Sequence, residues 1–407
     1  MTATITYRPD AQKTPGLYDR ILTREILQDI CVRITGQDNF RVIRDTSTYN
    51  KGRLITIEYG GSKSFVSLSE VSVGGRNQSV QSIPTAINLY YADNSSNKGL
   101  YYYFMPHSGN YFTDYHLLYF RLLKTAGVIF LNLLDFYPAG IKAFENIDEL
   151  IDERNDNRET NKSNNSSFIS KTSDKVQIYA KTYGASKYES TLLAIAAATI
   201  TDRPIDLFNI CEQDLTHLPQ ASLDTLNTMG NISIHDTSIT LEKRIFINQA
   251  SNNDFRSPIY QRNLLQRLGR KHCALCGCEI SEIIQGAHVW GVAEITRDDH
   301  FSDDAKFDHA INGENGLWLC QNHHKLFDSH YLSFNMDGHV LVPSNLRPED
   351  GMFIRAITIS EALDNLIMTD NFKWYLSQRN SIRDYSHYQR LVAVSYTHLT
   401  LPTICSV

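Results

Sequence analysis

The stretch that decides the fold runs from Asn315 to Asp328 and reads NGLWLCQNHHKLFD. Its pair Cys320-Gln-Asn-His323 has the same spacing as an upstream pair, Cys273-Ala-Leu-Cys276. A tight turn can present two side chains with this spacing to one tetrahedral ion, with zinc–sulfur distances near ~2.3 Å and zinc–nitrogen distances near ~2.0 Å. The sequence therefore predicts a structural Zn²⁺ site whose ligands are Cys273, Cys276, Cys320 and His323.

The placement of the cysteines indicates metal binding rather than disulfide formation. Cys31, Cys211 and Cys405 stand alone, whereas the other four cysteines fall in one short region that also holds several histidines. In a reducing cytosol such clustering is typical of a metal site. Cys278 lies beside the two ligand pairs but off their spacing, so we interpret it as a bystander.

Between the two ligand pairs the chain carries Gly286-Ala287-His288-Val289 and then Asn315. Together with the ligand pairs and the run that ends at Asp328, these motifs resemble the HNH (ββα-metal) nuclease family in content and order. The resemblance extends from about Lys271 to Val340 and says nothing about the chain before Ser251. In this family a β-hairpin and a following helix hold one divalent ion against the phosphate that is cut.

The resemblance implies a role for each matching residue. His288 would be the general base, because a neutral imidazole with a pKa near ~6.5 can take a proton from water. Asn315 would hold a turn of the hairpin, and His324 and Asp328, one helical turn apart, would bind a catalytic Mg²⁺ or Mn²⁺. Ala287 stands where many members carry a further ligand, so water and the substrate phosphate would complete the coordination.

We expect an α+β protein in which a mixed α/β N-terminal region precedes a small zinc-stabilised ββα-metal (HNH) nuclease module and C-terminal helices. The sequence predicts a hairpin with its turn at Gly60-Gly61, a helix over the alanine-rich run 189–199, and a helix that Ser257 caps. The expected division is 1–151 for an N-terminal region that recognises DNA, 152–173 for a polar linker or loop, 174–250 for a second α/β segment, 251–345 for the nuclease module, 346–394 for the C-terminal helices and 395–407 for a non-native tail.

The formal net charge of −6 does not by itself favour nucleic-acid binding, so a local basic surface would be needed. Two segments offer contacts to double-stranded DNA. One is basic and would meet phosphates, with solvated surface as the alternative. The other is the polar loop 74–82, which would hydrogen-bond base edges, with an ordinary loop as the alternative. The candidate residues are Arg262, Arg267, Arg270 and Lys271 in the first segment and Arg76 and Gln78 in the second.

Nothing in the sequence predicts a membrane partner or export. There is no uninterrupted apolar run of about 18 residues, the length of a membrane-spanning helix. Residues 1–15 lack the basic start and apolar middle of a secretory signal. We therefore expect a cytoplasmic protein without a membrane partner, and we allow for a homodimer.

The function that these residues favour is a metal-dependent, site-specific DNA endonuclease of the type II restriction kind. The large region before the nuclease module is the reason, since a bare cutting module would not need it. One alternative is an antiphage effector nuclease that a ligand or a modified base controls. A second alternative is a zinc-dependent DNA-binding protein without catalysis.

Overall fold

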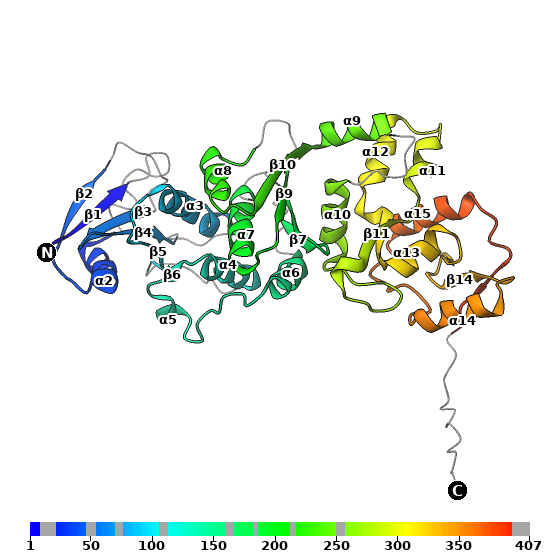
Figure 1. The fold of residues 1–407 in the computed structure, drawn as a ribbon, viewed down its shortest axis with the longest axis horizontal. Coiled ribbons are helices and arrows are strands. Elements are labelled where there is room, and N and C mark those ends of the chain that lie inside the picture. The colour runs from blue at the N-terminus through cyan, green and yellow to red at the C-terminus, as the bar shows by residue number, and fades with distance from the viewer. Residues whose placement is uncertain are drawn as a thin grey trace, which may run out of the picture. The chain divides into compact units, whose positions relative to one another are not determined.

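The computed structural model describes residues 1–8, 22–45, 54–69, 76–105, 113–158, 167–181, 186–211, 217–249 and 257–392. Within these ranges the side chains of 76–82, 186–188 and 248–249 are not described. The chain divides into two compact units, Met1–Glu242 and Lys243–Val407. Figure 1 colours the first unit from blue to green and the second from green to red.

The first unit begins with a six-stranded mixed sheet in the order β2-β1-β3-β4-β5-β6. Its strands are β1 (Ala3–Arg8), β2 (Phe40–Arg44), β3 (Leu54–Tyr59), β4 (Ser62–Leu68), β5 (Lys98–Tyr103) and β6 (Ile129–Phe130). Strands β3 and β4 form the predicted hairpin, and the turn residues Gly60 and Gly61 have φ values of 58° and 80°. Only glycine adopts positive φ without a steric penalty, which explains the two glycines in this turn.

A four-stranded sheet follows in the order β10-β9-β8-β7. Its strands are β7 (Phe168–Lys171), β8 (Val176–Lys181), β9 (Ile205–Cys211) and β10 (Ile232–Ser238), of which β8, β9 and β10 are parallel. Helices α7 (Ser186–Ile200) and α8 (Gln220–Asn227) connect the parallel strands. The remaining described helices of this unit are α2 (Arg24–Thr35), α3 (Arg76–Ala92), α4 (Asp114–Thr125), α5 (Leu133–Phe136) and α6 (Ile147–Asp156). Helix α9 (Ile239–Gln249) spans the boundary between the two units.

One hydrophobic core joins the two sheets of the first unit. It contains Phe65 and Tyr102 from the first sheet, Ile178 and Leu207 from the second, and Leu193 from α7. Helix α7 is the one predicted from the alanine-rich run, and residues 192–197 in it are all buried. Small side chains let this helix lie close to its neighbours on several sides.

The structure corrects the prediction that residues 152–173 are a linker or loop. Residues 152–156 belong to α6 and residues 168–171 form β7, while residues 159–166 lie outside the described part. The polar composition of this segment suggested a loop, but some of its polar side chains are buried, where they form ion pairs and hydrogen bonds. The fully buried guanidinium of Arg154 pairs with Glu189 at 3.1 Å, and the amide of Asn155 donates to the carbonyl of Ile169.

The second unit holds a two-stranded antiparallel hairpin, β11 (Ile284–His288) and β12 (Gly316–Cys320), followed by helix α13 (Gln321–Asp328). Helix α10 (Pro258–Leu268) begins after its N-cap Ser257, as predicted, and has Gly269 as its C-cap. The other elements are η2 (Ser281–Ile283), α11 (Val292–Arg297), α12 (Asp303–Ile311), η3 (Gly313–Asn315), β13 (Ser333–Phe334), β14 (Val340–Pro343), α14 (Pro348–Ile357), α15 (Asp370–Ser381) and β15 (Tyr388–Arg390).

The polar loop predicted over residues 74–82 is partly helical, because residues 76–82 open helix α3. Residues 303–311 form helix α12, whose Phe307 is buried. The tail 395–407 lies outside the described residues. None of the helices in the described part of the chain has the length and hydropathy that crossing a bilayer would require.

Candidate active site and metal centre

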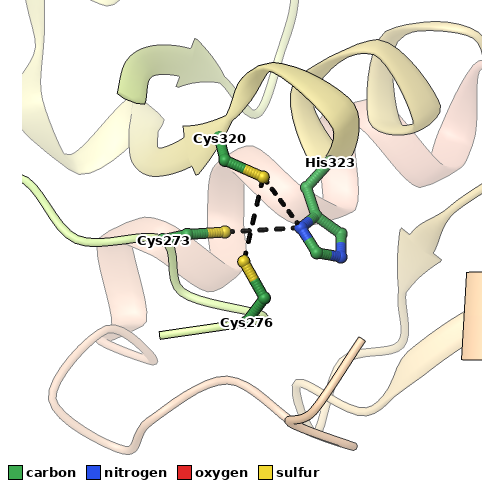
Figure 2. A group of neighbouring side chains, drawn as sticks. All are labelled: Cys273, Cys276, Cys320 and His323. Carbon is green, nitrogen blue, oxygen red and sulfur yellow. Dashed lines mark hydrogen bonds between the residues drawn. The ribbon is translucent and has the colours of Figure 1, made fainter. Parts of the chain in front are cut away.

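The side chains of Cys273, Cys276, Cys320 and His323 converge in the second unit, as Figure 2 shows. The sulfur atoms of Cys276 and Cys320 are 3.8 Å apart. The Nδ1 atom of His323 lies 3.4 Å from the sulfur of Cys273 and 3.2 Å from that of Cys320. A zinc tetrahedron with ordinary bond lengths has edges of about 3.5 to 3.8 Å. The spacing of these four side chains fits one zinc ion.

Local structure explains how the four ligands meet. Cys320 ends strand β12 and is the N-cap of α13, so His323 falls in the first turn of that helix. The other two cysteines lie on a turn that a backbone hydrogen bond of 2.8 Å from Cys273 N to Cys278 O closes. Cys278 supplies this carbonyl, and its side chain is not part of the ligand group found among the described residues.

The environment of the ligands also favours a cation. Burial raises the pKa of the Cys276 thiol to about 12, and the neighbouring thiols of Cys273 and Cys320 add to the shift. Three thiols this close cannot ionise together unless a positive charge joins them, and a divalent ion supplies that charge. The Nε2 atom of His323 points away from the sulfurs and lies 3.1 Å from the hydroxyl of Thr358, which fixes the ring orientation.

His288 is the last residue of β11 and lies opposite Gly316 of β12. Its Nε2 is 2.9 Å from the carbonyl oxygen of Ala310. A carbonyl oxygen only accepts hydrogen bonds, so Nε2 carries the proton and Nδ1 keeps a free lone pair. Burial, with a smaller contribution from His324, lowers the pKa of His288 to about 4, although the hydrogen bond to Ala310 acts in the opposite direction. The imidazole is therefore neutral at pH 7.

Asn315 is fully buried directly before β12. Its side-chain oxygen accepts from Trp290 N at 2.8 Å, and its amide nitrogen donates to the carbonyls of Trp290 and His309 at 3.0 and 3.2 Å. Its backbone carbonyl accepts from Val289 N at 3.0 Å. Asn315 thus holds the segment that follows His288, which is the structural role the sequence indicated; its part in catalysis stays a prediction.

His324 and Asp328 lie together on α13, with Nε2 of the imidazole 3.3 Å from a carboxylate oxygen. The Nδ1 atom of His324 is 2.9 Å from the side-chain oxygen of Gln285 on β11. An amide oxygen only accepts hydrogen bonds, so Nδ1 carries the proton. The lone pair of Nε2 and the carboxylate of Asp328 are then both available as ligands for a metal ion. Gln285 was missed in the sequence because its position on the strand facing α13 was not visible there.

Among the described residues, no third His, Cys, Asp or Glu joins His324 and Asp328. The binding of the catalytic ion by His324 and Asp328 alone stays a prediction. The remaining ligands of the ion would be oxygen atoms of water and of the substrate phosphate, which Mg²⁺ commonly binds.

Helix α15 lies outside the sequence motifs of the nuclease family, but one of its residues contacts the site. The buried guanidinium of Arg379 donates to the carbonyl of Val289 at 3.2 Å and to that of Phe327 at 2.6 Å. The first acceptor follows His288 and the second precedes Asp328 in the chain. Arg379 therefore links the end of strand β11, next to His288, to helix α13, which carries His324 and Asp328.

The structure changes the interpretation of the basic segment. Arg262 is buried and donates to Gln266, while Arg267 pairs with Glu314 at 2.7 Å and donates to the carbonyls of Gly313, Gly316 and Ile367. Lys271 is buried with its ammonium over the ring of Trp318. All three side chains have partners within the module, so the described contacts give no support to their predicted role in DNA binding.

Arg270 remains as the phosphate candidate of the basic segment. It is exposed and lies 3.2 Å from Glu279, which is itself largely exposed. The predicted contacts of Arg76 and Gln78 fall at the start of α3, where side chains are not described, so they stay predictions.

A two-stranded hairpin, the helix behind it and a Cys3His cluster that could hold zinc are the parts of a nuclease module of the ββα-metal class. Residues 273–335 match the family described as HNH endonuclease, and the C-terminal module is an HNH endonuclease domain. The match implies a metal-dependent nuclease with DNA as its substrate. A comparison with curated proteins gave no match to the chain. No observation on the described residues supports the homodimer.

Proposed function

We propose that the protein is a site-specific DNA endonuclease of the type II restriction kind that acts on duplex DNA in the cytoplasm. One observation carries the proposal: His288 ends β11 with its Nε2 fixed on the carbonyl of Ala310, and the helix that follows the paired strand β12 carries His324 beside Asp328. A merely structural zinc module would need none of these three side chains in this arrangement.

The residues divide the chemistry between them. His288 takes a proton from water through Nδ1, because Nε2 is engaged by Ala310. The water oxygen then attacks the phosphorus and the 3′ oxygen leaves, without a covalent enzyme intermediate. Mg²⁺ or Mn²⁺ held by His324 and Asp328 would neutralise the charge that builds on the phosphate and the leaving oxygen. The zinc ligands act at a distance, by holding β12 and α13 in place.

The first unit is the proposed recognition region. It spans Met1–Glu242 and has its own hydrophobic core, so it is far larger than the cutting module requires. A folded unit of this size attached to a nuclease is what sequence recognition on a duplex would need. The helix α3 that carries Arg76 and Gln78 is where we propose that base contacts be sought.

Digestion of unmethylated plasmid DNA with Mg²⁺ or Mn²⁺ tests this function. Discrete bands with mapped ends support a restriction enzyme. Smearing that requires an added ligand or modified DNA would favour the gated antiphage effector instead. An intact plasmid that is nevertheless bound would favour the zinc-dependent binder.

The His288→Ala variant is the matched control for that digestion. It should lose cleavage by about 10²- to 10⁴-fold, the usual contribution of a general base, while it keeps its fold and its affinity for DNA. Loss of DNA binding together with cleavage would show that His288 is structural and not the base.

A further inference from the structure

Helix α10 lies before the segment that matches the nuclease family, and it contributes a residue to the catalytic centre. The ring of Tyr260 is stacked on the imidazole of His288, with 3.9 Å between the ring centroids and 15° between the planes. The phenol hydroxyl donates to the carbonyl of Ala287 at 3.3 Å. Both contacts fall on the last two residues of β11.

The hairpin is shaped to admit this ring. A Cβ atom at Gly316 would lie 2.1 Å from the Tyr260 hydroxyl oxygen, and one at Gly286 would lie 2.8 Å from Leu264 and 3.2 Å from the Tyr260 ring. Both glycines are on the strand face that carries His288, because Gly316 pairs with His288 and Gly286 is two residues before it. Any larger residue at either position would push α10 away from the imidazole.

We propose that Tyr260 is a positioning residue for His288, holding one face of the imidazole while the carbonyl of Ala310 holds its Nε2 edge. The proposal rests on the proposed function of His288 as the base. With both constraints, the ring can neither tilt nor turn, and the Nδ1 lone pair stays aimed in one direction. Misplacement of a catalytic group by about 1 Å can cost about 100-fold in rate, so such a clamp has a measurable effect.

The ring also sets the environment in which His288 titrates. Tyr260 is buried and its phenol pKa is raised far above the ordinary value, so it adds no charge. The titratable side chain that acts on the imidazole is His324 on α13. Removal of the aromatic ring would let water reach the imidazole and bring its pKa back toward that of free histidine.

Three variants separate positioning from stability. Tyr260→Phe keeps the ring and should keep kcat within a few-fold. Tyr260→Leu should lower kcat by about 10- to 100-fold with little change in KM for DNA, and should move the acidic limb of the pH profile upward. Leu265→Ala removes a buried side chain from the same helix at about 140° from Tyr260, and should lower the melting temperature without moving the pH profile.

The outcomes are decisive in both directions. Equal pH profiles in Tyr260→Leu and the unmodified protein would overturn the proposal, as would the same shift in Leu265→Ala. NMR of ¹³C-labelled histidine in the full chain gives a readout without cleavage: the ring-current shift of His288 should persist in Tyr260→Phe and vanish in Tyr260→Leu. An unmodified protein that shows this shift but cuts no DNA would overturn the proposed function and leave the stacking intact.

Discussion

The Nδ1 atom of His324 lies 2.9 Å from the side-chain oxygen of Gln285, so a strand residue sets the orientation of a helix residue. This contact leaves Nε2 of His324 beside Asp328. It joins the two elements of the hairpin-and-helix module at the point where an ion is expected. Partners of this kind to metal-binding histidines tune metal affinity.

Replacement of Gln285 by Ala should weaken the response to Mn²⁺ by about 10- to 100-fold, because the His324 ring loses the hydrogen bond that orients it. The measurement is the Mn²⁺ concentration that gives half-maximal cleavage. Gln321→Ala, an exposed residue at the start of α13, is the control and should leave that concentration unchanged. Equal metal dependence in both variants would contradict the role given to Gln285.

The pH profile of cleavage should have its acidic limb well below that of free histidine. The neutral form of His288 is the base, so the rate rises with pH through its pKa and is level above it. Burial lowers that pKa to about 4, compared with about 6.5 for an unperturbed imidazole. Single-turnover rates at pH 5.5 and 7 should therefore be similar, and half-maximal activity near pH 6.5 would refute the assignment.

The same shift has a consequence for stability. The folded state keeps His288 neutral, whereas the unfolded chain protonates it below about pH 6.5. The stabilisation is present above that pH and falls as the pH drops toward 4. Melting temperatures over this range should decrease in the unmodified protein and decrease less in His288→Ala.

Cys276→Ser should lose zinc and unfold the module, whereas Cys278→Ser should do neither. Structural zinc contributes on the order of 10 kcal/mol to small domains of this type. Cys276 is one of the four converging ligands, and Cys278 is two residues away but not in the group. Metal analysis and thermal melting of the two variants check this directly, and normal zinc content in Cys276→Ser would contradict the ligand set.

Replacement by Ala should affect DNA binding at Arg270 and stability at Arg267. The side chain of Arg270 is exposed, so its loss should weaken DNA binding. The slope of log K for DNA binding against log salt concentration should become shallower by the amount that corresponds to about one phosphate contact. Arg267 bonds to Glu314 and to three carbonyls, so its loss should lower the melting temperature instead. Filter binding at several salt concentrations separates the two effects, and a salt slope that does not change in Arg270→Ala would remove that residue from the interface.

Arg379→Met should destabilise the module by about 3 to 5 kcal/mol, because two buried carbonyls lose their donor and the tie between Val289 and Phe327 is broken. Arg383→Met, an exposed position beyond the same helix, is the control and should change stability little. Chemical denaturation of both variants gives the comparison. A variant of Arg379 as stable as the control would show that the two elements hold together without it.

The sequence by itself determined the nuclease module and the four side chains that could hold zinc, because both depend on spacing along the chain. Two residues between zinc ligands make a turn, and the three residues between His324 and Asp328 place both side chains on one helix face; neither inference needs the rest of the fold. The Gly60-Gly61 turn and the Ser257 cap are local in the same way and were confirmed.

Only the tertiary structure decided which polar residues are buried and what they contact. Arg154 and Arg267 look like surface charges in the sequence, but each has a partner far along the chain, in Glu189 and Glu314. The contacts of His288 with Tyr260 and Ala310, and of His324 with Gln285, likewise join residues from separate elements. Such contacts follow from the packing of helices on the hairpin, which spacing along one segment does not specify.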